Sequence, residues 1–132
     1  MGKAEDSLGS RDVKTHFGTG RTGSSTVRRT IDALLADTLD LVAQPRNPTT
    51  PGHFSNYAFE PAGEEQLTEW MLDHLTLATW VPPTDTVLAD VETAVLQVLL
   101  PPLNLSKVRT PWRPVVSAAR KQQATAASLW VP

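Results

Sequence analysis

The stretch LTLATWVPPTDTVLADVETAVLQVLL, residues 75–100, decides the fold class, because it combines the pattern of a strand with that of a helix. Residues 75–81 alternate apolar with polar or small side chains and end at two prolines, which is typical of a β-strand. Residues 85–100 carry apolar side chains at helical spacing and end at a second pair of prolines, which a helix interior does not tolerate. We therefore predict an α/β chain of the α+β type.

Helical patterns also lie on both sides of this stretch. The clearest covers residues 25–40, where apolar side chains recur at steps of three and four residues. A hydroxyl from Ser24 or Ser25 is expected to cap its free N–H groups. Further helices are expected at residues 7–17, at residues 63–74 and, after Pro114, in the basic tail to about residue 127.

The segment 44–61 contains four prolines and no periodic pattern. Proline lacks a backbone donor and has a fixed φ, so we expect a long loop here. Four ring side chains cluster in its second half: His53, Phe54, Tyr57 and Phe59. Because aromatic rings are costly to leave in water, part of this loop is expected to pack against the body of the protein.

Length and composition exclude several classes of protein. A chain of 132 residues predicts one domain, and the absence of cysteine excludes disulfide frameworks, zinc ribbons and thiol nucleophiles. No apolar run is long enough to span a bilayer, and the first residues lack the apolar core of a secretory signal. We therefore expect a globular, cytoplasmic protein without a membrane segment.

The net charge of −2 hides an uneven distribution of charge along the chain. Residues 1–30 and 101–132 are basic, whereas residues 31–100 carry eleven acidic side chains against the single cation Arg46. Basic ends of this kind favour a polyanion such as DNA as a partner, because Lys and Arg displace counterions from phosphates. The alternative is that the basic ends fold onto the acidic middle and neutralise it.

The glycines of Gly18-x-Gly20-x-x-Gly23 match a dinucleotide-binding pattern in spacing only. That pattern requires a buried strand before it and a parallel strand after the following helix, and neither is expected here. We interpret the segment as a turn followed by a helix cap, from which Arg21 and free amides remain able to contact a phosphate.

Three other places carry candidate chemistry. Arg11, Lys14 and His16 combine cations with an imidazole, which suits a phosphodiester, although a solvated basic face is the alternative. Glu92 lies at the margin of the apolar face of its helix, where a carboxylate must be paired, hydrogen-bonded or bound to a cation unless it reaches solvent. Asn104, between two leucines, either satisfies backbone groups or orients a ligand.

Several short motifs keep the order and spacing of a known family. They are Gly2-Lys3-Ala4-Glu5-Asp6-Ser7-Leu8 with Arg11 and His16-Phe17, Gly20-Arg21-Thr22-Gly23-Ser24-Ser25, Asp90-Val91-Glu92, and Pro101-Pro102-Leu103-Asn104. Through these motifs, most of residues 2–113 resembles the GIY-YIG nuclease superfamily, and most closely a branch of bacterial GIY-YIG-like proteins.

The resemblance implies a small, mainly antiparallel sheet flanked by helices, and hydrolysis of DNA phosphodiesters with Mg²⁺ or another divalent cation. By position, it implies that Glu92 holds the cation, that Arg11 stabilises the phosphate, and that His16 and Asn104 complete the catalytic group. The expected nucleic-acid contacts are Lys3, Lys14, Arg21 and Arg28. The nuclease-like domain is expected to cover residues 1–113, and a basic helix or tail residues 114–132.

The family's two motif tyrosines have no counterpart in this chain. Tyr57 is the only tyrosine, and it lies in the proline-rich loop. The resemblance therefore implies that the first strands are missing, that the sheet is incomplete, and that the chain hydrolyses DNA weakly or not at all. The alternative is a non-catalytic module that binds nucleic acid or protein. The two hypotheses differ at Glu92, whose neutralisation removes metal affinity only in the first.

Overall fold

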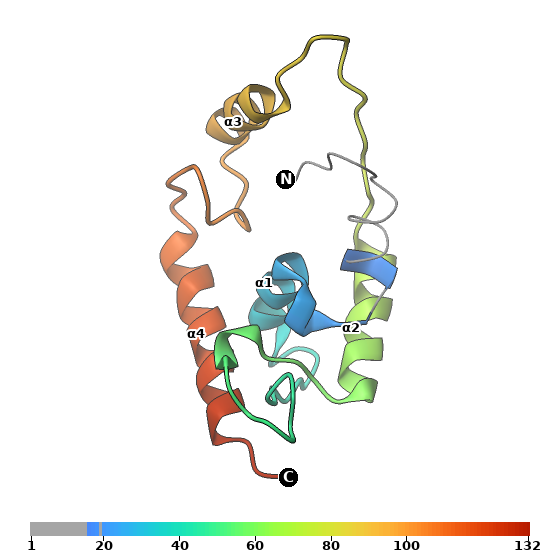
Figure 1. Ribbon diagram of the computed structural model, residues 1–132, viewed down its shortest axis with the longest axis vertical. Helices are drawn as coiled ribbons and strands as arrows, with labels where there is room; N and C mark the ends of the chain where they lie inside the picture. The colour runs from blue at the N-terminus through green and yellow to red at the C-terminus, as the bar shows by residue number, and fades with distance from the viewer. Residues whose placement is uncertain (1–15, 19) are drawn as a thin grey trace.

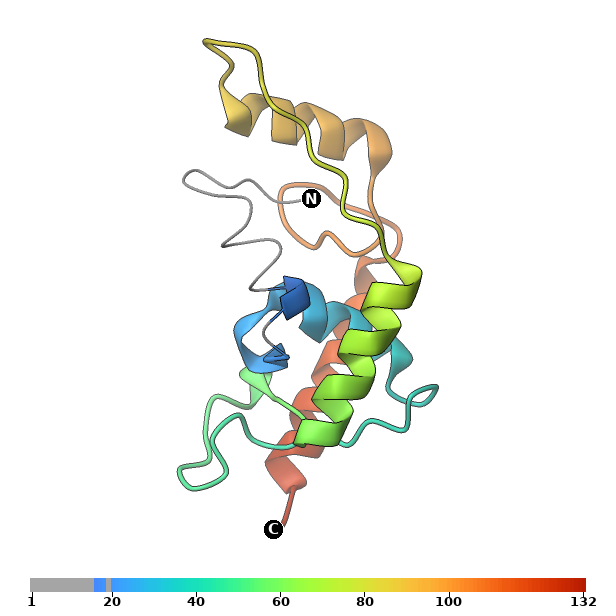
Figure 2. The ribbon, with the colours of Figure 1, turned by 90° about the vertical axis from the view of Figure 1, so that its right-hand side faces the viewer.

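The computed structural model describes residues 16–18 and 20–132. Within them the chain forms four α-helices and two short 3-10 helices: η2 (Thr22–Ser24), α1 (Thr26–Leu35), η3 (Phe54–Asn56), α2 (Pro61–His74), α3 (Leu88–Leu99) and α4 (Arg113–Leu129). Residues 16–18 form a π-helical turn. Helices α1, α2 and α4 lie together, while α3 lies at the end of the molecule opposite the C-terminus (Figures 1 and 2).

The predicted sheet is wrong for the part of the chain that the structure describes. Residues 75–83, which include the predicted strand, belong to no helix or strand, and the β-structure among the described residues is one isolated antiparallel bridge between Gln44 and Ala58. An alternating pattern stabilises a strand only when another strand pairs with its backbone. No described segment pairs with residues 75–81, and Leu77, Trp80 and Val81 are exposed. The described part of the chain, residues 16–18 and 20–132, is therefore helical, and the predicted α+β class is not what it shows.

Helix α1 confirms the predicted helix and its cap, although it is shorter than expected. The side chain of Ser25 accepts a hydrogen bond from the backbone N–H of Arg28, which is the geometry of an N-cap. The helix ends at Leu35, and residues 36–40 form turns that end in a left-handed residue, Asp40. Residues 36–40, predicted as the last turn of the helix, instead form turns that change the direction of the chain.

Two apolar clusters hold the helices together. One consists of Leu41, Ala43, Tyr57, Phe59 and Ala127, so it joins the proline-rich loop to α4. The other consists of Ile31, Leu67 and Met71, and joins α1 to α2. The prediction that aromatic residues of the loop pack inward is confirmed for Tyr57 and Phe59, which are buried, whereas His53 is exposed.

Helix α3 begins and ends close to its predicted bounds, but its apolar stripe is not the buried face that the sequence suggested. Val87, Val98 and Leu99 are exposed, and Leu96 is the buried residue of the helix. The helix ends at Leu100, whose backbone is left-handed (φ 43°) and whose N–H bonds the carbonyl of Leu96. Two prolines follow, as the sequence predicted.

Helix α4 forms where the basic tail was expected to be helical, and it packs along α1 and η3 (Figure 1). Val116, Gln123 and Ala127 are its buried residues. Among the described residues, no helix combines the length and the apolar character needed to cross a membrane.

Candidate functional site

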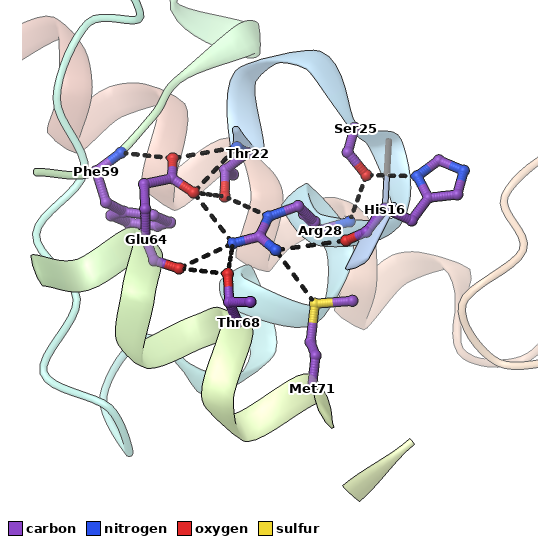
Figure 3. Close-up of polar contacts among 8 residues, drawn as sticks. All are labelled: His16, Thr22, Ser25, Arg28, Phe59, Glu64, Thr68 and Met71. Carbon is purple, nitrogen blue, oxygen red and sulfur yellow. Dashed lines mark hydrogen bonds and ion pairs between the residues drawn. The ribbon is translucent and has the colours of Figure 1, made fainter. Parts of the chain in front are cut away.

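A buried ion pair links α1 to α2. Arg28 is fully buried, and its Nη2 donates to the Oε2 of Glu64 at 3.1 Å (Figure 3). The same nitrogen donates to the Glu64 carbonyl and to the Thr68 hydroxyl, both at 3.0 Å. The Nε of Arg28 donates to the Thr22 hydroxyl at 3.3 Å. With donors satisfied on several sides, the guanidinium tolerates complete burial.

The Glu64 carboxylate is equally well satisfied. Its oxygens accept the backbone N–H of Thr22 at 3.1 Å, the Thr22 hydroxyl at 2.8 Å and the N–H of Phe59 at 3.3 Å. One carboxylate thereby joins η2, the end of the proline-rich loop and α2. The group is therefore a structural hub.

His16 is held beside this hub. Its Nδ1 lies 2.7 Å from the Oγ of Ser25, the residue that caps α1. Its carbonyl accepts a hydrogen bond from Nη1 of Arg28 at 3.4 Å (Figure 3). The imidazole is therefore fixed at one nitrogen by a hydroxyl, which leaves the tautomer to be set by the direction of that bond.

Glu92 lies in α3, on a different element from the Arg28–Glu64 hub. Its carboxylate forms an ion pair with the ammonium of Lys107, from the segment after α3. The side chain of Glu92 is 13% exposed, and that of Lys107 is 38% exposed. The structure therefore satisfies the requirement that a carboxylate near an apolar face be compensated, and the compensating group is a lysine.

Asn104 lies in the same segment as Lys107. Its Nδ2 donates to the carbonyl of Ser106 at 2.6 Å, and its backbone N–H donates to the carbonyl of Pro101. Both bonds are local, so Asn104 shapes the turn that leads from α3 to Lys107. Of the two roles considered from the sequence, this geometry matches an amide that satisfies backbone groups.

An open cavity of about 860 Å³ lies between the glycine-rich segment and the start of α2. Its wall includes Arg21 and Arg46 together with the exposed carboxylates Glu65 and Glu69. A wall with two carboxylates repels a phosphate. The cavity therefore does not offer the uniformly basic surface that a nucleic-acid backbone requires.

A second buried polar group joins α1 to Tyr57. The tyrosine hydroxyl lies 2.7 Å from the carbonyl of Arg29 and 2.7 Å from Oδ1 of Asp32, and both Tyr57 and Asp32 are fully buried. A phenol has one hydrogen and a peptide carbonyl has none, so two short bonds require a second hydrogen, which a protonated Asp32 supplies. Burial raises the pKa of Asp32 to about 7, in agreement with this count.

The charged side chains near Asp32 do not return it to the ionised form. Among the described residues, Oδ2 of Asp32 and Nε of Arg29 have no hydrogen-bond partner, so the two side chains do not form a bidentate pair. Arg29 instead donates to the Gly23 carbonyl at 2.8 Å and to the Thr26 hydroxyl. Burial lowers the pKa of Arg29 and raises that of Tyr57, so every titratable member of the group is shifted toward its neutral form.

The structure describes five of the eight predicted site residues. Lys3, Arg11 and Lys14 lie outside the described residues. His16 lies against the N-terminus of α1, while Glu92 and Asn104 lie in α3 and the turn that follows it. Of the predicted nucleic-acid contacts, Arg21 is exposed, but Arg28 is fully buried against Glu64 and has no surface with which to reach a phosphate.

Sequence reasoning missed Glu64, Ser25 as a partner of His16, and Lys107. For Glu64, the spacing of the apolar residues around it did contain a signal. Arg28 shares a helix face with Ile31 and Leu35, and Glu64 shares one with Leu67 and Met71. An arginine and a glutamate on two apolar faces predict a buried pair, whereas nothing in the sequence pairs Lys107 with Glu92.

The model of the GIY-YIG catalytic domain family matches residues 1–122. The chain belongs to the GIY-YIG family. The match covers all the residues that the sequence assigned to the site and runs past residue 113 into α4. No curated protein and no solved structure matches the chain. The GIY-YIG family is a family of nucleases. The positions and contacts of the side chains indicate which residues of this chain suit nuclease chemistry.

GIY-YIG nucleases generally depend on a divalent metal. Among the described residues, no three His, Asp or Glu side chains are grouped to hold a metal ion. Mg²⁺ nevertheless keeps several waters and is often bound through one or two carboxylates together with substrate phosphates. Glu92 fits that mode of binding, because its carboxylate is mostly shielded from solvent and already accepts a cation, the Lys107 ammonium.

Proposed function

We propose that this GIY-YIG chain is a metal-dependent DNA endonuclease domain in which Glu92 is the protein ligand of the divalent cation. The observation that carries the proposal is the setting of Glu92. Its carboxylate is largely shielded and faces a cation from a segment that has no acidic residue after α3. A carboxylate beside a basic segment is suited to bind a metal ion and a phosphate together.

The remaining roles follow from the chemistry of each side chain. When bound, the divalent cation supplies Lewis-acid stabilisation of charge on the phosphate. Arg11 contributes a guanidinium, whose planar donors match two phosphate oxygens. His16, fixed through Ser25, contributes an imidazole as a group for proton transfer. Asn104 keeps the turn after α3 in place, and therefore positions the segment that faces Glu92.

The DNA backbone is proposed to contact Lys3, Lys14 and Arg21. Each of these side chains supplies a positive charge in the basic first 30 residues. Arg28 is not included, because its guanidinium is consumed by Glu64, Thr68 and Thr22.

The proposed activity is low. The chain has one tyrosine, and Tyr57 is fully buried with its hydroxyl bonded to Asp32 and to a backbone carbonyl. In the GIY-YIG family a motif tyrosine acts on the attacking water, and the buried hydroxyl of Tyr57 has no access to such a water. The sequence contains no other tyrosine. The expected activity is slow, metal-dependent nicking of DNA rather than rapid cleavage.

The test is nicking of supercoiled plasmid DNA with the purified chain in Mg²⁺ or in excess EDTA. We expect slow conversion to the open circle in Mg²⁺, none in EDTA, and none for Glu92→Gln in either condition. The exposed carboxylate of Asp90, on the same helix, provides the matched control, and Asp90→Asn should nick like the unsubstituted chain. Equal nicking by the Glu92→Gln and Asp90→Asn variants would overturn the proposal.

One observation favours a second candidate, a non-catalytic module that binds nucleic acid or protein. The Lys107 ammonium is a counter-charge for Glu92 that the chain itself supplies. This alternative predicts that Glu92→Gln leaves nucleic-acid binding unchanged or tighter, and that Mg²⁺ has no effect on it. The measurement is fluorescence anisotropy of labelled duplex DNA with and without Mg²⁺.

A further inference from the structure

Lys107 occupies the place on Glu92 where the proposed function requires a divalent cation. Its ammonium is in direct contact with Oε2 of Glu92, and the two residues are 15 positions apart in the chain. An ammonium and a divalent cation do not share one carboxylate without repulsion, because both carry positive charge. Binding of the metal ion at Oε2 therefore requires that Lys107 move.

The segment after α3 is folded so as to bring Lys107 back to the helix. Leu100 turns the chain through a left-handed conformation, and Asn104 holds the carbonyl of Ser106. The N–H of Val108 bonds the same carbonyl at 2.8 Å, and Val108 is buried. Lys107, between these two anchors, has a left-handed backbone (φ 65°), which is uncommon for a residue other than glycine.

The ion pair between Lys107 and Glu92 is easily replaced by a contact between Glu92 and another cation. The segment is anchored by the side-chain amide of Asn104, by backbone hydrogen bonds and by the buried side chain of Val108. The Lys107 side chain, in contrast, is 38% exposed and has a flexible stem. A partly exposed ion pair of this kind contributes little to stability. A divalent cation can therefore displace the ammonium without unfolding the turn.

The freed ammonium would remain among cations. Arg109 and Arg113 follow it, Arg113 bonds the carbonyl of Leu105 at 2.9 Å, and residues 101–132 contain no acidic side chain. Once Glu92 is occupied by a metal ion, the described part of this segment offers Lys107 no second carboxylate. A phosphate of bound DNA is the anion that the proposed function brings to this place.

We propose that Lys107 is the resident counter-ion of Glu92, that a divalent cation displaces it, and that the displaced ammonium then binds a DNA phosphate. This inference rests on the proposed function, since it takes Glu92 as the metal ligand. Lys107 is a positioning residue in this account, because it controls metal affinity and substrate contact and takes no part in bond breaking.

The test measures binding of Mn²⁺ alone to the purified chain, with free Mn²⁺ followed by electron paramagnetic resonance. Lys107→Met keeps the length of the stem and removes the charge, and we expect it to bind Mn²⁺ roughly two- to fivefold more tightly than the unsubstituted chain. Lys107→Arg keeps the charge and should bind like the unsubstituted chain. Lys121→Met removes an exposed lysine from α4 and should also leave the affinity unchanged.

The outcomes separate this inference from the function on which it rests. If Glu92→Gln abolishes Mn²⁺ binding but Lys107→Met binds no more tightly than the unsubstituted chain, Lys107 is not a competing counter-ion and the inference is wrong. If Glu92→Gln binds Mn²⁺ like the unsubstituted chain, the metal is not at Glu92, and both the inference and the proposed function fail.

A second measurement tests the contact with phosphate. Binding of labelled duplex DNA in Ca²⁺ is followed as the salt concentration rises. Lys107→Met should reduce the slope of log affinity against log salt by about one, which is the loss expected for one phosphate contact. An unchanged slope in Ca²⁺ would contradict the second half of the proposal.

Discussion

Replacing Asp32 by asparagine tests the assignment of a buried, neutral carboxylic acid between α1 and Tyr57. Asparagine has nearly the same shape, carries no charge at any pH, and donates from its amide to the Tyr57 oxygen as a protonated Asp32 does. The tyrosine hydrogen then remains available for the carbonyl of Arg29. The variant therefore keeps the bonds of the protonated state and removes the possibility of ionisation.

The magnitude follows from the pKa of Asp32, which burial raises from 3.8 to about 7. Between these two values the unfolded chain is ionised while the folded chain still holds the proton, so stability is lost as the pH rises toward 7. The whole loss is on the order of 4 kcal/mol, because one pKa unit corresponds to about 1.4 kcal/mol. Roughly 2 to 3 kcal/mol of this falls between pH 5 and pH 8.

The other charges near this group are Arg28, Arg29, Glu64 and Arg120, and they are present in both proteins. The quantity to measure is therefore the difference in unfolding free energy between Asp32→Asn and the unsubstituted chain, from urea titrations followed by tryptophan fluorescence. That difference should grow in favour of the variant by roughly 2 to 3 kcal/mol from pH 5 to pH 8.

The matched control is Asp37→Asn, which neutralises an exposed carboxylate in the turn after α1. Its difference from the unsubstituted chain should change by no more than about 0.5 kcal/mol over the same range. If the difference in unfolding free energy for Asp32→Asn is equally independent of pH, Asp32 ionises normally in the folded protein. The assignment of a hydrogen to Asp32 beside Tyr57 is then wrong.

Three further substitutions test the packing around the hub, each by urea unfolding at pH 7. Glu64→Gln leaves the buried Arg28 without its counter-charge and should cost about 3 to 5 kcal/mol, with an unchanged midpoint contradicting the ion pair. Gly23→Ala would place a Cβ 2.9 Å from the carbonyl oxygen of Asn56, so a loss of about 1 to 3 kcal/mol is expected, and a neutral effect would mean that the loop moves freely. Ser25→Ala removes the cap of α1 and should cost about 1 kcal/mol while shifting the imidazole signals of His16 in NMR spectra; unshifted signals would exclude the Ser25 contact.

The sequence predicted the helices where their local signals agree with one another. Ser25 supplied a cap just before an apolar period, and α1 begins directly after it. The proline pair at residues 101–102 marked the end of α3, and the helix ends at Leu99, just before it. Local chemistry was sufficient for these elements, because a helix satisfies its own backbone.

The prediction of a strand was wrong because a strand is stable only when it pairs with another strand, and no local sequence pattern reveals such a partner. Residues 75–81 have the alternation of a strand, yet the structure pairs them with no described segment. Similarly, Arg28 was predicted to contact nucleic acid, whereas it lies on the helix face of Ile31 and is buried. Lys107 was missed since its contact with Glu92 depends on two left-handed residues, Leu100 and Lys107 itself.

The central claim, that Glu92 holds a divalent cation, is tested most directly by affinity cleavage of the protein chain. Fe²⁺ bound in place of Mg²⁺, with ascorbate and peroxide, cuts the backbone next to the metal ion, and mass spectrometry locates the cuts. We expect cuts near Glu92 and near Lys107, and their loss in Glu92→Gln. Cuts at Glu65 and Glu69 instead, unaffected by Glu92→Gln, would place the metal in the cavity beside α2 and contradict the account.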